Sequence, residues 1–128
     1  MLTTAIKNAL LDQIKLGLND AYLIEDPSLT IALGSTRTAV DALSVTYPAY
    51  YDLVWDSASV SKVITTNSPN NSNPINFSVK ALESPNRLVI VDNSDVAVCI
   101  FELATPIPSY TVAGPYYVRQ LSLEITEV

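Results

Sequence analysis

The sequence predicts a mainly β fold: an antiparallel, jelly-roll-like β-sandwich that follows one N-terminal amphipathic α-helix. Apolar residues recur with helical spacing only at the start of the chain. Beyond that segment, short runs rich in β-branched and aromatic residues alternate with turn-forming residues, as is typical of antiparallel sheets. The length of 128 residues suits one domain, and 48% apolar against 16% charged residues indicates a chain that folds. We therefore expect residues 1–128 to form a single β-sandwich domain.

The N-terminal helix is expected over about residues 4–16. Apolar side chains recur every four residues from Ile6 to Ile14, whereas polar side chains fall elsewhere on the helix. A hydroxyl from Thr3 or Thr4 can accept a backbone N–H in the first turn. These features predict an amphipathic helix.

The remainder of the chain, from about residue 21 to 126, is predicted to form short strands separated by turns. The nine expected strands are Ala21–Ile24, Leu29–Leu33, Tyr50–Trp55, Val60–Thr66, Ile75–Val79, Arg87–Val91, Val96–Leu103, Tyr110–Val112 and Tyr116–Thr126. The polar turn Asp92–Asp95 joins two nearly continuous apolar runs, which predicts a hairpin at the centre of the sheet. The segment Asn67–Pro74 contains no apolar residue and is expected to be an exposed loop.

Charge and composition argue against two classes of partner. The chain carries 13 acidic and 7 basic residues, and a net charge of −6 repels a phosphate backbone, so we expect no nucleic-acid partner. The sequence has neither a membrane-length apolar stretch nor a signal-type N-terminus, so we expect a soluble, non-secreted chain with no membrane partner. Cys99 is the only cysteine, and its apolar surroundings predict a small buried side chain.

Residue types also argue against catalysis. The chain has no histidine, which removes the commonest general base and the usual zinc ligand. Asp92–Asp95 resembles a calcium-binding cluster but lacks the glycine and the distal glutamate of such loops, so a turn is the better interpretation. We therefore expect no enzyme activity, no catalytic residues, no cofactor and no metal.

The tyrosines offer the best candidate interface. They cluster on either side of Pro48 and after Pro115, and neighbouring side chains on a strand point to opposite faces. Some should therefore point outward, either into a partner or onto the ends of the sandwich. The candidate interface residues are Tyr47, Tyr50, Tyr51, Tyr116 and Tyr117. Trp55 is expected in the core, although it or an exposed tyrosine would also suit stacking on a sugar ring.

Several segments in a particular order resemble a family of small phage virion proteins, often labelled tail-fibre-like or head-decoration proteins. After the N-terminal helix come Leu29–Gly34 and Ile75–Phe77, which resemble two strands of that family. Leu88–Asp92 resembles its apolar strand that ends in aspartate, and Phe101–Pro106 its turn with threonine and proline. Tyr110–Gly114 is similar to the segment that leads into its last strand.

The resemblance implies a virion structural protein: a capsid decoration or cement protein, or an accessory subunit of the tail or baseplate. Such a protein packs against other virion proteins, forms a homo-oligomer such as a trimer, and assembles in the bacterial cytoplasm. The alternative that the residues leave open is a carbohydrate-binding β-sandwich module for host-surface recognition.

Overall fold

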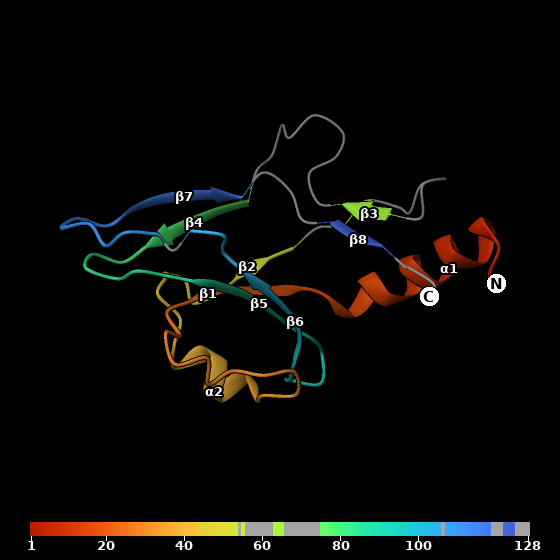
Figure 1. Cartoon of the computed structure of the whole chain (residues 1–128), viewed down its shortest axis with the longest axis horizontal. Helices are drawn as coiled ribbons and strands as arrows, with labels where there is room; N and C mark the ends of the chain where they lie inside the picture. The colour runs from red at the N-terminus through yellow and green to blue at the C-terminus, as the bar shows by residue number, and fades with distance from the viewer. Residues whose placement is uncertain (54, 56–62, 66–74, 106, 119–121, 125–128) are drawn as a thin grey trace.

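The computed structural model describes residues 1–53, 55, 63–65, 75–105, 107–118 and 122–124. Within these residues, antiparallel strands form most of the regular structure and a helix precedes them (Figure 1). The expectation of a β-rich chain with an N-terminal helix is confirmed. None of the helices in this described part has the length and apolar character that crossing a bilayer requires.

A four-stranded antiparallel sheet in the order β2-β1-β5-β6 lies at the centre of the molecule. Its strands are β1 (Asp20–Ile24), β2 (Tyr51–Asp52), β5 (Arg87–Val91) and β6 (Ala97–Glu102). The side chains of β1 and β5 alternate between its two faces. Leu23 and Leu88 are paired on one face, and Tyr22 and Val89 on the other. All four are buried, so the sheet needs a covering layer on each side.

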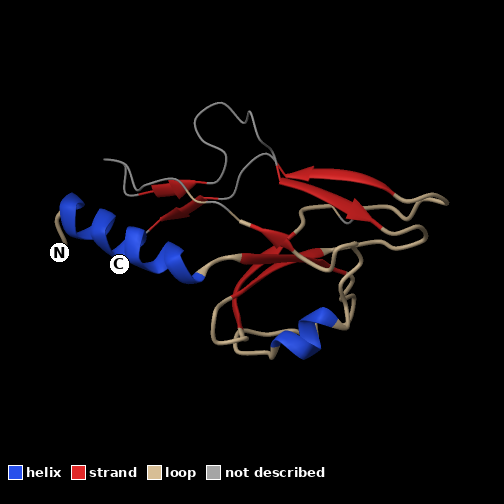
Figure 2. Ribbon diagram, turned by 180° about the vertical axis from the view of Figure 1, so that it is seen from behind, coloured by secondary structure: helices blue, strands red, loops and turns tan. Residues whose placement is uncertain are grey.

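A two-stranded ribbon covers the first face. It consists of β4 (Ile75–Val79) and β7 (Gly114–Val118), which run antiparallel with Phe77 opposite Tyr116. Ile75 and Phe77 are buried against the sheet, and Tyr116 packs on the same core. Figures 1 and 2 show this ribbon on the opposite side of the sheet from the second helix.

The second helix, α2 (Arg37–Asp41), covers the other face together with the loops around it (Figure 2). Its Val40 is fully buried against Tyr22 and Val89. The side chain of Thr36 accepts the N–H of Ala39 at 3.2 Å and caps the helix. No helix is predicted from the sequence at these residues.

The N-terminal helix, α1 (Thr4–Ile14), lies at one end of the molecule and leads through a 3₁₀ turn (Lys15–Gly17) into β1 (Figure 1). The hydroxyl of Thr3 accepts the N–H of Ile6 at 3.2 Å, as the capping prediction required. Beside α1, β3 (Val63–Thr65) pairs with β8 (Ser122–Glu124), and β3 packs against the helix.

Two predicted strands are wrong. Leu29–Leu33 is a loop, because the buried carboxylate of Asp26 accepts the N–H groups of Thr30 and Ile31, which a sheet would have used. Tyr110–Val112 is also irregular. Its side chains are exposed, and the carbonyl of Tyr110 accepts the N–H of Leu82 from a neighbouring loop.

The other predicted strands agree more closely with the observed ones. Ile75–Val79 and Arg87–Val91 match β4 and β5, and the hairpin across Asp92–Asp95 is confirmed. Its second strand, however, lies at the edge of the described sheet rather than at the centre. The expected strand Tyr50–Trp55 reduces to β2, and Tyr116–Thr126 is divided between β7 and β8. Most of Val60–Thr66 and the whole of Asn67–Pro74 lie outside the described residues.

Candidate functional site

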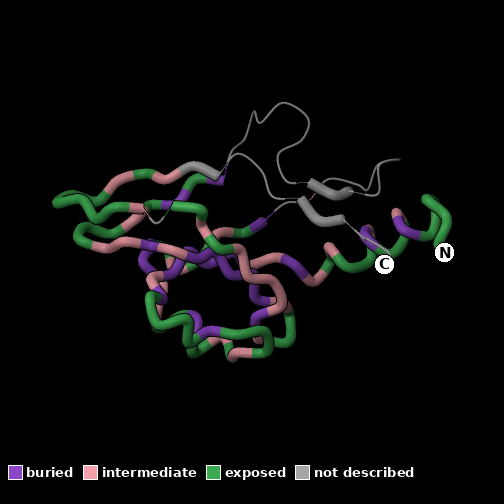
Figure 3. Tube along the Cα trace, viewed as in Figure 1, coloured by how far each residue is buried: buried purple, intermediate pink, exposed green. Residues whose placement is uncertain are grey.

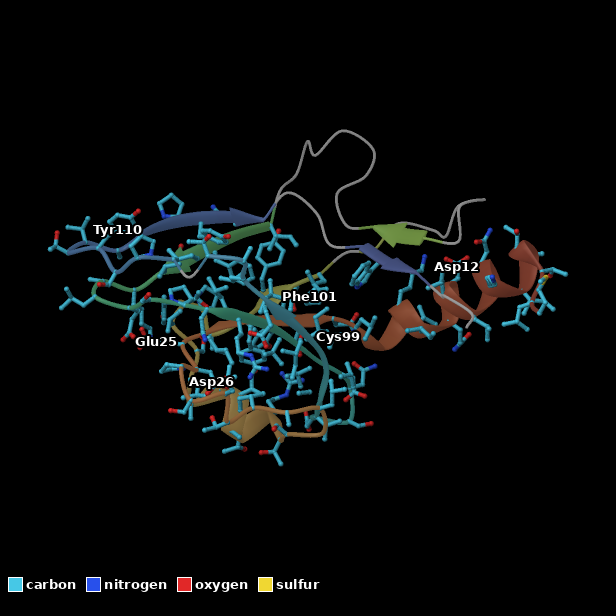
Figure 4. The ribbon with its side chains drawn as sticks, viewed as in Figure 1. Asp12, Glu25, Asp26, Cys99, Phe101 and Tyr110 are labelled. Carbon is cyan, nitrogen blue, oxygen red and sulfur yellow. The ribbon has the colours of Figure 1, made fainter. Side chains whose placement is uncertain are left out.

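A buried ion pair fastens the loop after β1 to the central sheet. Asp26 is 2% exposed, and its carboxylate accepts the N–H of Thr30 and of Ile31, each at 2.9 Å, and the hydroxyl of Thr30 at 2.8 Å. Nη1 of Arg87 donates to the same carboxylate at 2.9 Å and to the carbonyl of Ile31 at 2.8 Å. Arg87 also pairs with the exposed Glu102 at 2.8 Å. Figure 4 shows Asp26 between the sheet and the α2 layer.

The electrostatics of Asp26 match a structural role. Burial by itself would raise the pKa of this carboxyl, but the N–H groups of Ile31 and Thr30, the hydroxyl of Thr30 and the guanidinium of Arg87 outweigh it. The pKa therefore falls from 3.8 to about 2. A permanently charged carboxylate whose oxygens are occupied by loop donors holds the loop in place and is poorly suited to proton transfer.

A second ionic cluster ties α2 to the sheet. Arg37 pairs with Asp20 at 2.8 Å and with Asp95 at 2.7 Å, and it donates to the hydroxyl of Tyr22 at 3.1 Å. Its guanidinium carbon lies 6.0 Å and 5.8 Å from the ring centroids of Tyr22 and Tyr50. Burial alone would lower the pKa of Arg37, but its bonds to Asp95, Tyr22 and Asp20 raise it. The cluster therefore joins β1, α2 and the β5–β6 turn.

The segment Asp92–Asp95 is a turn, as predicted. The carboxylate of Asp92 accepts the N–H of Ser94 at 2.9 Å, and Asp95 adopts a left-handed backbone with φ of 63°. Across the described residues, no three His, Cys, Asp or Glu side chains come together as metal ligands would.

Cys99 is half-buried on β6 (Figure 4), where its side chain packs against the core beneath the β4–β7 ribbon. Burial raises the pKa of its thiol. The thiol is therefore less reactive than a free cysteine, in keeping with the structural role expected from the sequence.

The structure separates the tyrosines expected at an interface. Tyr47, at the cis bond to Pro48, is 81% exposed. Tyr50 is 39% exposed and lies against the ring of Tyr22. Tyr51 packs inward against Phe77, with ring centroids 5.9 Å apart. Tyr116 is partly buried on the same core, and the side chain of Tyr117 lies outside the described residues.

Trp55 packs on the core face, as predicted. It shares that face with Tyr51 and Leu53, as alternate residues of an extended chain do. Its indole N–H donates to the carbonyl of Leu18 at 2.7 Å, close to the junction of α1 and β1. This hydrogen bond fixes the ring beside the core.

A pocket of about 340 Å³ is lined by residues of two loops and of the β4–β7 ribbon. Figure 4 shows one of these residues, Tyr110, at the end of the molecule opposite α1. The N–H of Leu82 donates to the carbonyl of Tyr110 at 2.7 Å, which joins the two loops. Tyr110 is 63% exposed, and Tyr116, Lys80 and Glu83 line the same pocket. The pocket therefore combines aromatic walls with one positive and one negative side chain.

The most unusual surface is the solvent-exposed side of α1. We define the outer face of α1 by its exposed residues after the first position, namely Ala5, Ile6, Ala9, Leu10, Gln13 and Ile14. None of these residues is charged. The charged residues of this segment lie outside this face: Lys7 is 8% exposed, and the side chain of Lys15, 17% exposed, pairs at 3.0 Å with that of Asp12, which is 42% exposed. Figure 3 shows the helix extending from the buried centre of the molecule.

Sequence reasoning missed both the Asp26–Arg87 pair and the pocket around Tyr110. Asp26 stands before Pro27, a pair typical of turns, and Arg87 stands 61 positions later at the start of an apolar strand. A charged residue that opens an otherwise apolar strand is a signal that could have suggested a buried partner. The pocket has no signal in the sequence, because irregular loops assemble it.

We compared the chain with protein-family models, with curated proteins and with solved structures, and found no match in any of the three.

Proposed function

We propose that this chain is a structural subunit of a phage virion that works by packing against other protein subunits. The observation that carries the proposal is the uncharged outer face of α1. Exposed helix faces normally carry the charged side chains, whereas here Ile6, Leu10 and Ile14 are 49%, 43% and 48% exposed. An apolar face of this kind marks a surface that a protein partner covers.

The ionic clusters support the same proposal. The Asp26–Arg87 pair holds a loop, and the Arg37 cluster joins a helix, a strand and a turn. Each is accounted for by the fold, and neither lines the pocket around Tyr110. The buried charges therefore hold the loop, the helix and the turn in fixed positions. A subunit needs such a fixed shape in order to fit its neighbours.

The finer parts of the proposal come from the family resemblance. They are a jelly-roll-like sandwich, a homo-oligomer such as a trimer, and a place as a capsid decoration or cement protein or as a tail or baseplate accessory. A central sheet covered by a ribbon on one face is compatible with such a sandwich. Among the expected tyrosines whose side chains the structure describes, Tyr47 is the one whose exposure best suits an intersubunit contact.

The test is to locate the chain in purified particles of the phage that encodes it, by quantitative mass spectrometry. We expect a fixed ratio to the major capsid or tail protein, because a structural subunit occupies a defined number of symmetric positions. Finding the chain only in the free-protein fractions of the infected cell would contradict the proposal.

A matched pair of variants connects incorporation to the outer face of α1. Leu10→Glu should lower the number of copies per particle by roughly tenfold, since a new charge must be buried at the contact. Leu33→Glu introduces the same charge at a 68% exposed leucine outside α1 and should leave incorporation unchanged. Equal incorporation of the two variants would show that the contact lies elsewhere.

The second candidate function is carbohydrate binding, which the pocket around Tyr110 favours. Its tyrosines offer faces for a sugar ring, and Lys80 and Glu83 offer a donor and an acceptor for hydroxyl groups. A glycan array with the intact chain tests this function, and Tyr110→Ala should abolish any signal. Tyr47→Ala, at an exposed tyrosine that does not line the pocket, is the control.

A further inference from the structure

We infer that the outer face of α1 binds the same face of a second copy of this chain, with the two helices antiparallel. This inference rests on the proposed function, because it names the partner that covers the face. Three observations carry it: the residue types on the face, the distribution of charge along the chain, and the way in which α1 joins the sheet.

The residue types suit close contact between two helices. Ala5 and Ala9 are exposed beside Ile6 and Leu10, so small and large side chains alternate on one surface. Small residues let two helix backbones approach, and the large ones fill the spaces between them. The same face on a second copy presents the same pattern, so a two-fold axis makes the surface complementary to itself.

The charge distribution favours a second copy at this end of the molecule. Residues 1–18 together with the adjoining strands β3 and β8 carry Lys7, Lys15, Asp12 and Glu124, a net charge of zero. Residues 19–53 and 75–118, which form the central sheet and its covering layers, carry nine acidic and three basic residues, a net charge of −6. Two copies therefore repel each other less where they meet through α1 than where their acidic sheets meet.

The same charges select the antiparallel arrangement. The C-terminal end of α1 leads into the acidic sheet, whereas its N-terminal end lies far from that sheet (Figures 1 and 3). A parallel pair would place two acidic sheets side by side, but an antiparallel pair places them at opposite ends of the helices. The two helix dipoles also oppose each other in the antiparallel pair.

The helix is short, so the contact is weak and belongs in an assembly with further contacts. Half-exposed Ile6, Leu10 and Ile14 together offer on the order of 100–200 Å² of apolar area. A standard interface buries about 800 Å² on each partner. Association of the isolated chain should therefore be seen only at high concentration, and chemical cross-linking can detect it there.

The antiparallel pair predicts which residues meet. The helix runs from Thr4 to Ile14, and a two-fold axis near Leu10 places Leu10 beside its own copy and Ile6 beside Ile14. The test uses the full chain with Cys99→Ser, Leu10→Cys as the probe, and a short bis-maleimide as the cross-linker. Leu33→Cys is the control, because Leu33 is even more exposed and lies outside α1.

We expect Leu10→Cys to yield covalent dimer at least about tenfold faster than Leu33→Cys, because association raises the local thiol concentration. Added salt should increase the difference between these two rates, because it screens the repulsion between the acidic sheets of the two copies. Ala9→Glu in the Leu10→Cys chain should reduce the rate to that of the control while the helix is retained, since glutamate is a good helix former. Equal rates for Leu10→Cys and Leu33→Cys would overturn the inference.

Direction is tested by mixing Ile6→Cys with a size-tagged Ile14→Cys chain. The antiparallel pair predicts mainly mixed dimers, whereas a majority of Ile6–Ile6 dimers would refute the antiparallel arrangement. These outcomes are separate from the proposed function. If the chain is found in particles and Leu10→Glu blocks its incorporation, but Leu10→Cys does not cross-link, the partner on α1 is a different virion protein.

Discussion

Replacing Asp26 by asparagine tests whether one buried carboxylate fixes the loop that follows β1. The substitution preserves the size of the side chain and removes its charge, which leaves Arg87 buried at 7% exposure beside a neutral amide. Asp26 also anchors the N–H groups of Thr30 and Ile31. The whole loop therefore depends on this group.

The magnitude follows from the pKa. A fall in the pKa of Asp26 from 3.8 to about 2 corresponds to about 2.5 kcal/mol of stabilisation, at about 1.4 kcal/mol per pH unit. Loss of one partner of a buried ion pair costs about 3–5 kcal/mol in other proteins. We expect Asp26→Asn to lower the free energy of unfolding by about 2.5–4 kcal/mol, and the midpoint of thermal unfolding by roughly 10 °C.

Urea denaturation followed by the fluorescence of Trp55, the only tryptophan, measures this loss. Glu102→Gln is the matched control, because it neutralises the other carboxylate that pairs with Arg87. The side chain of Glu102 is 59% exposed. The control should cost less than about 1 kcal/mol. If Asp26→Asn lies within about 0.5 kcal/mol of the wild type, the buried pair does not fix the loop.

The sign of the pH dependence gives a further check. The pKa of Asp26 is lower in the folded state than in the unfolded state. The contribution of Asp26 to the free energy of unfolding is therefore complete above about pH 4 and disappears as the pH falls through about 2. The stability difference between the wild type and Asp26→Asn should therefore shrink across that interval. A difference that stays constant from pH 5 to pH 2 would contradict a charged, hydrogen-bonded carboxylate.

Three further predictions concern other positions. Arg37→Ala should cost about 1.5–3 kcal/mol and weaken the near-ultraviolet circular dichroism of the ring pair that includes Tyr50, whereas an unchanged spectrum would contradict the observed stacking. Gly34→Ala should cost about 1 kcal/mol in urea denaturation, because Gly34 has φ of +91°, while Gly17→Ala should cost nothing; equal losses would exclude backbone strain. Cys99 should react with a thiol reagent at pH 8 more than about tenfold faster in urea than in the native state, since burial raises its pKa; equal rates would show that it is open to solvent.

Strands whose apolar residues are either nearly continuous or regularly alternating were predicted best. Arg87–Val91 and Ile75–Val79 were located to the residue, because their side chains are dictated by burial on one or both faces. The predicted hairpin was found because Asp92–Asp95 has the residues that a tight turn needs. Local chemistry determined these elements.

Elements that depend on partners far along the chain were predicted poorly. Leu29–Leu33 has the composition of a strand, yet Asp26 holds its first N–H groups and Arg87, from another strand, holds Asp26 in turn. Tyr50 and Tyr51 were expected to point to opposite sides, and they do contact different aromatic rings. How much of each tyrosine a partner can reach depends on how far Tyr22 or Phe77 covers its ring. The spacing of the tyrosines in the sequence did not reveal where these two rings lie.

The orientation of α1 could not be derived from periodicity either, and it is the feature with the largest functional consequence. The helix buries Lys7 beside Leu11 and leaves Ile6, Leu10 and Ile14 about half-exposed. Full burial of such a side chain stabilises a fold by about 1.5–3 kcal/mol. Three side chains that stay about half-exposed therefore leave roughly 2–4 kcal/mol of stabilisation unused. That is a sizeable part of the 5–15 kcal/mol that stabilises an ordinary domain. A partner on the outer face would recover this free energy, which is why an assembly contact accounts for the orientation of the helix better than an isolated chain does.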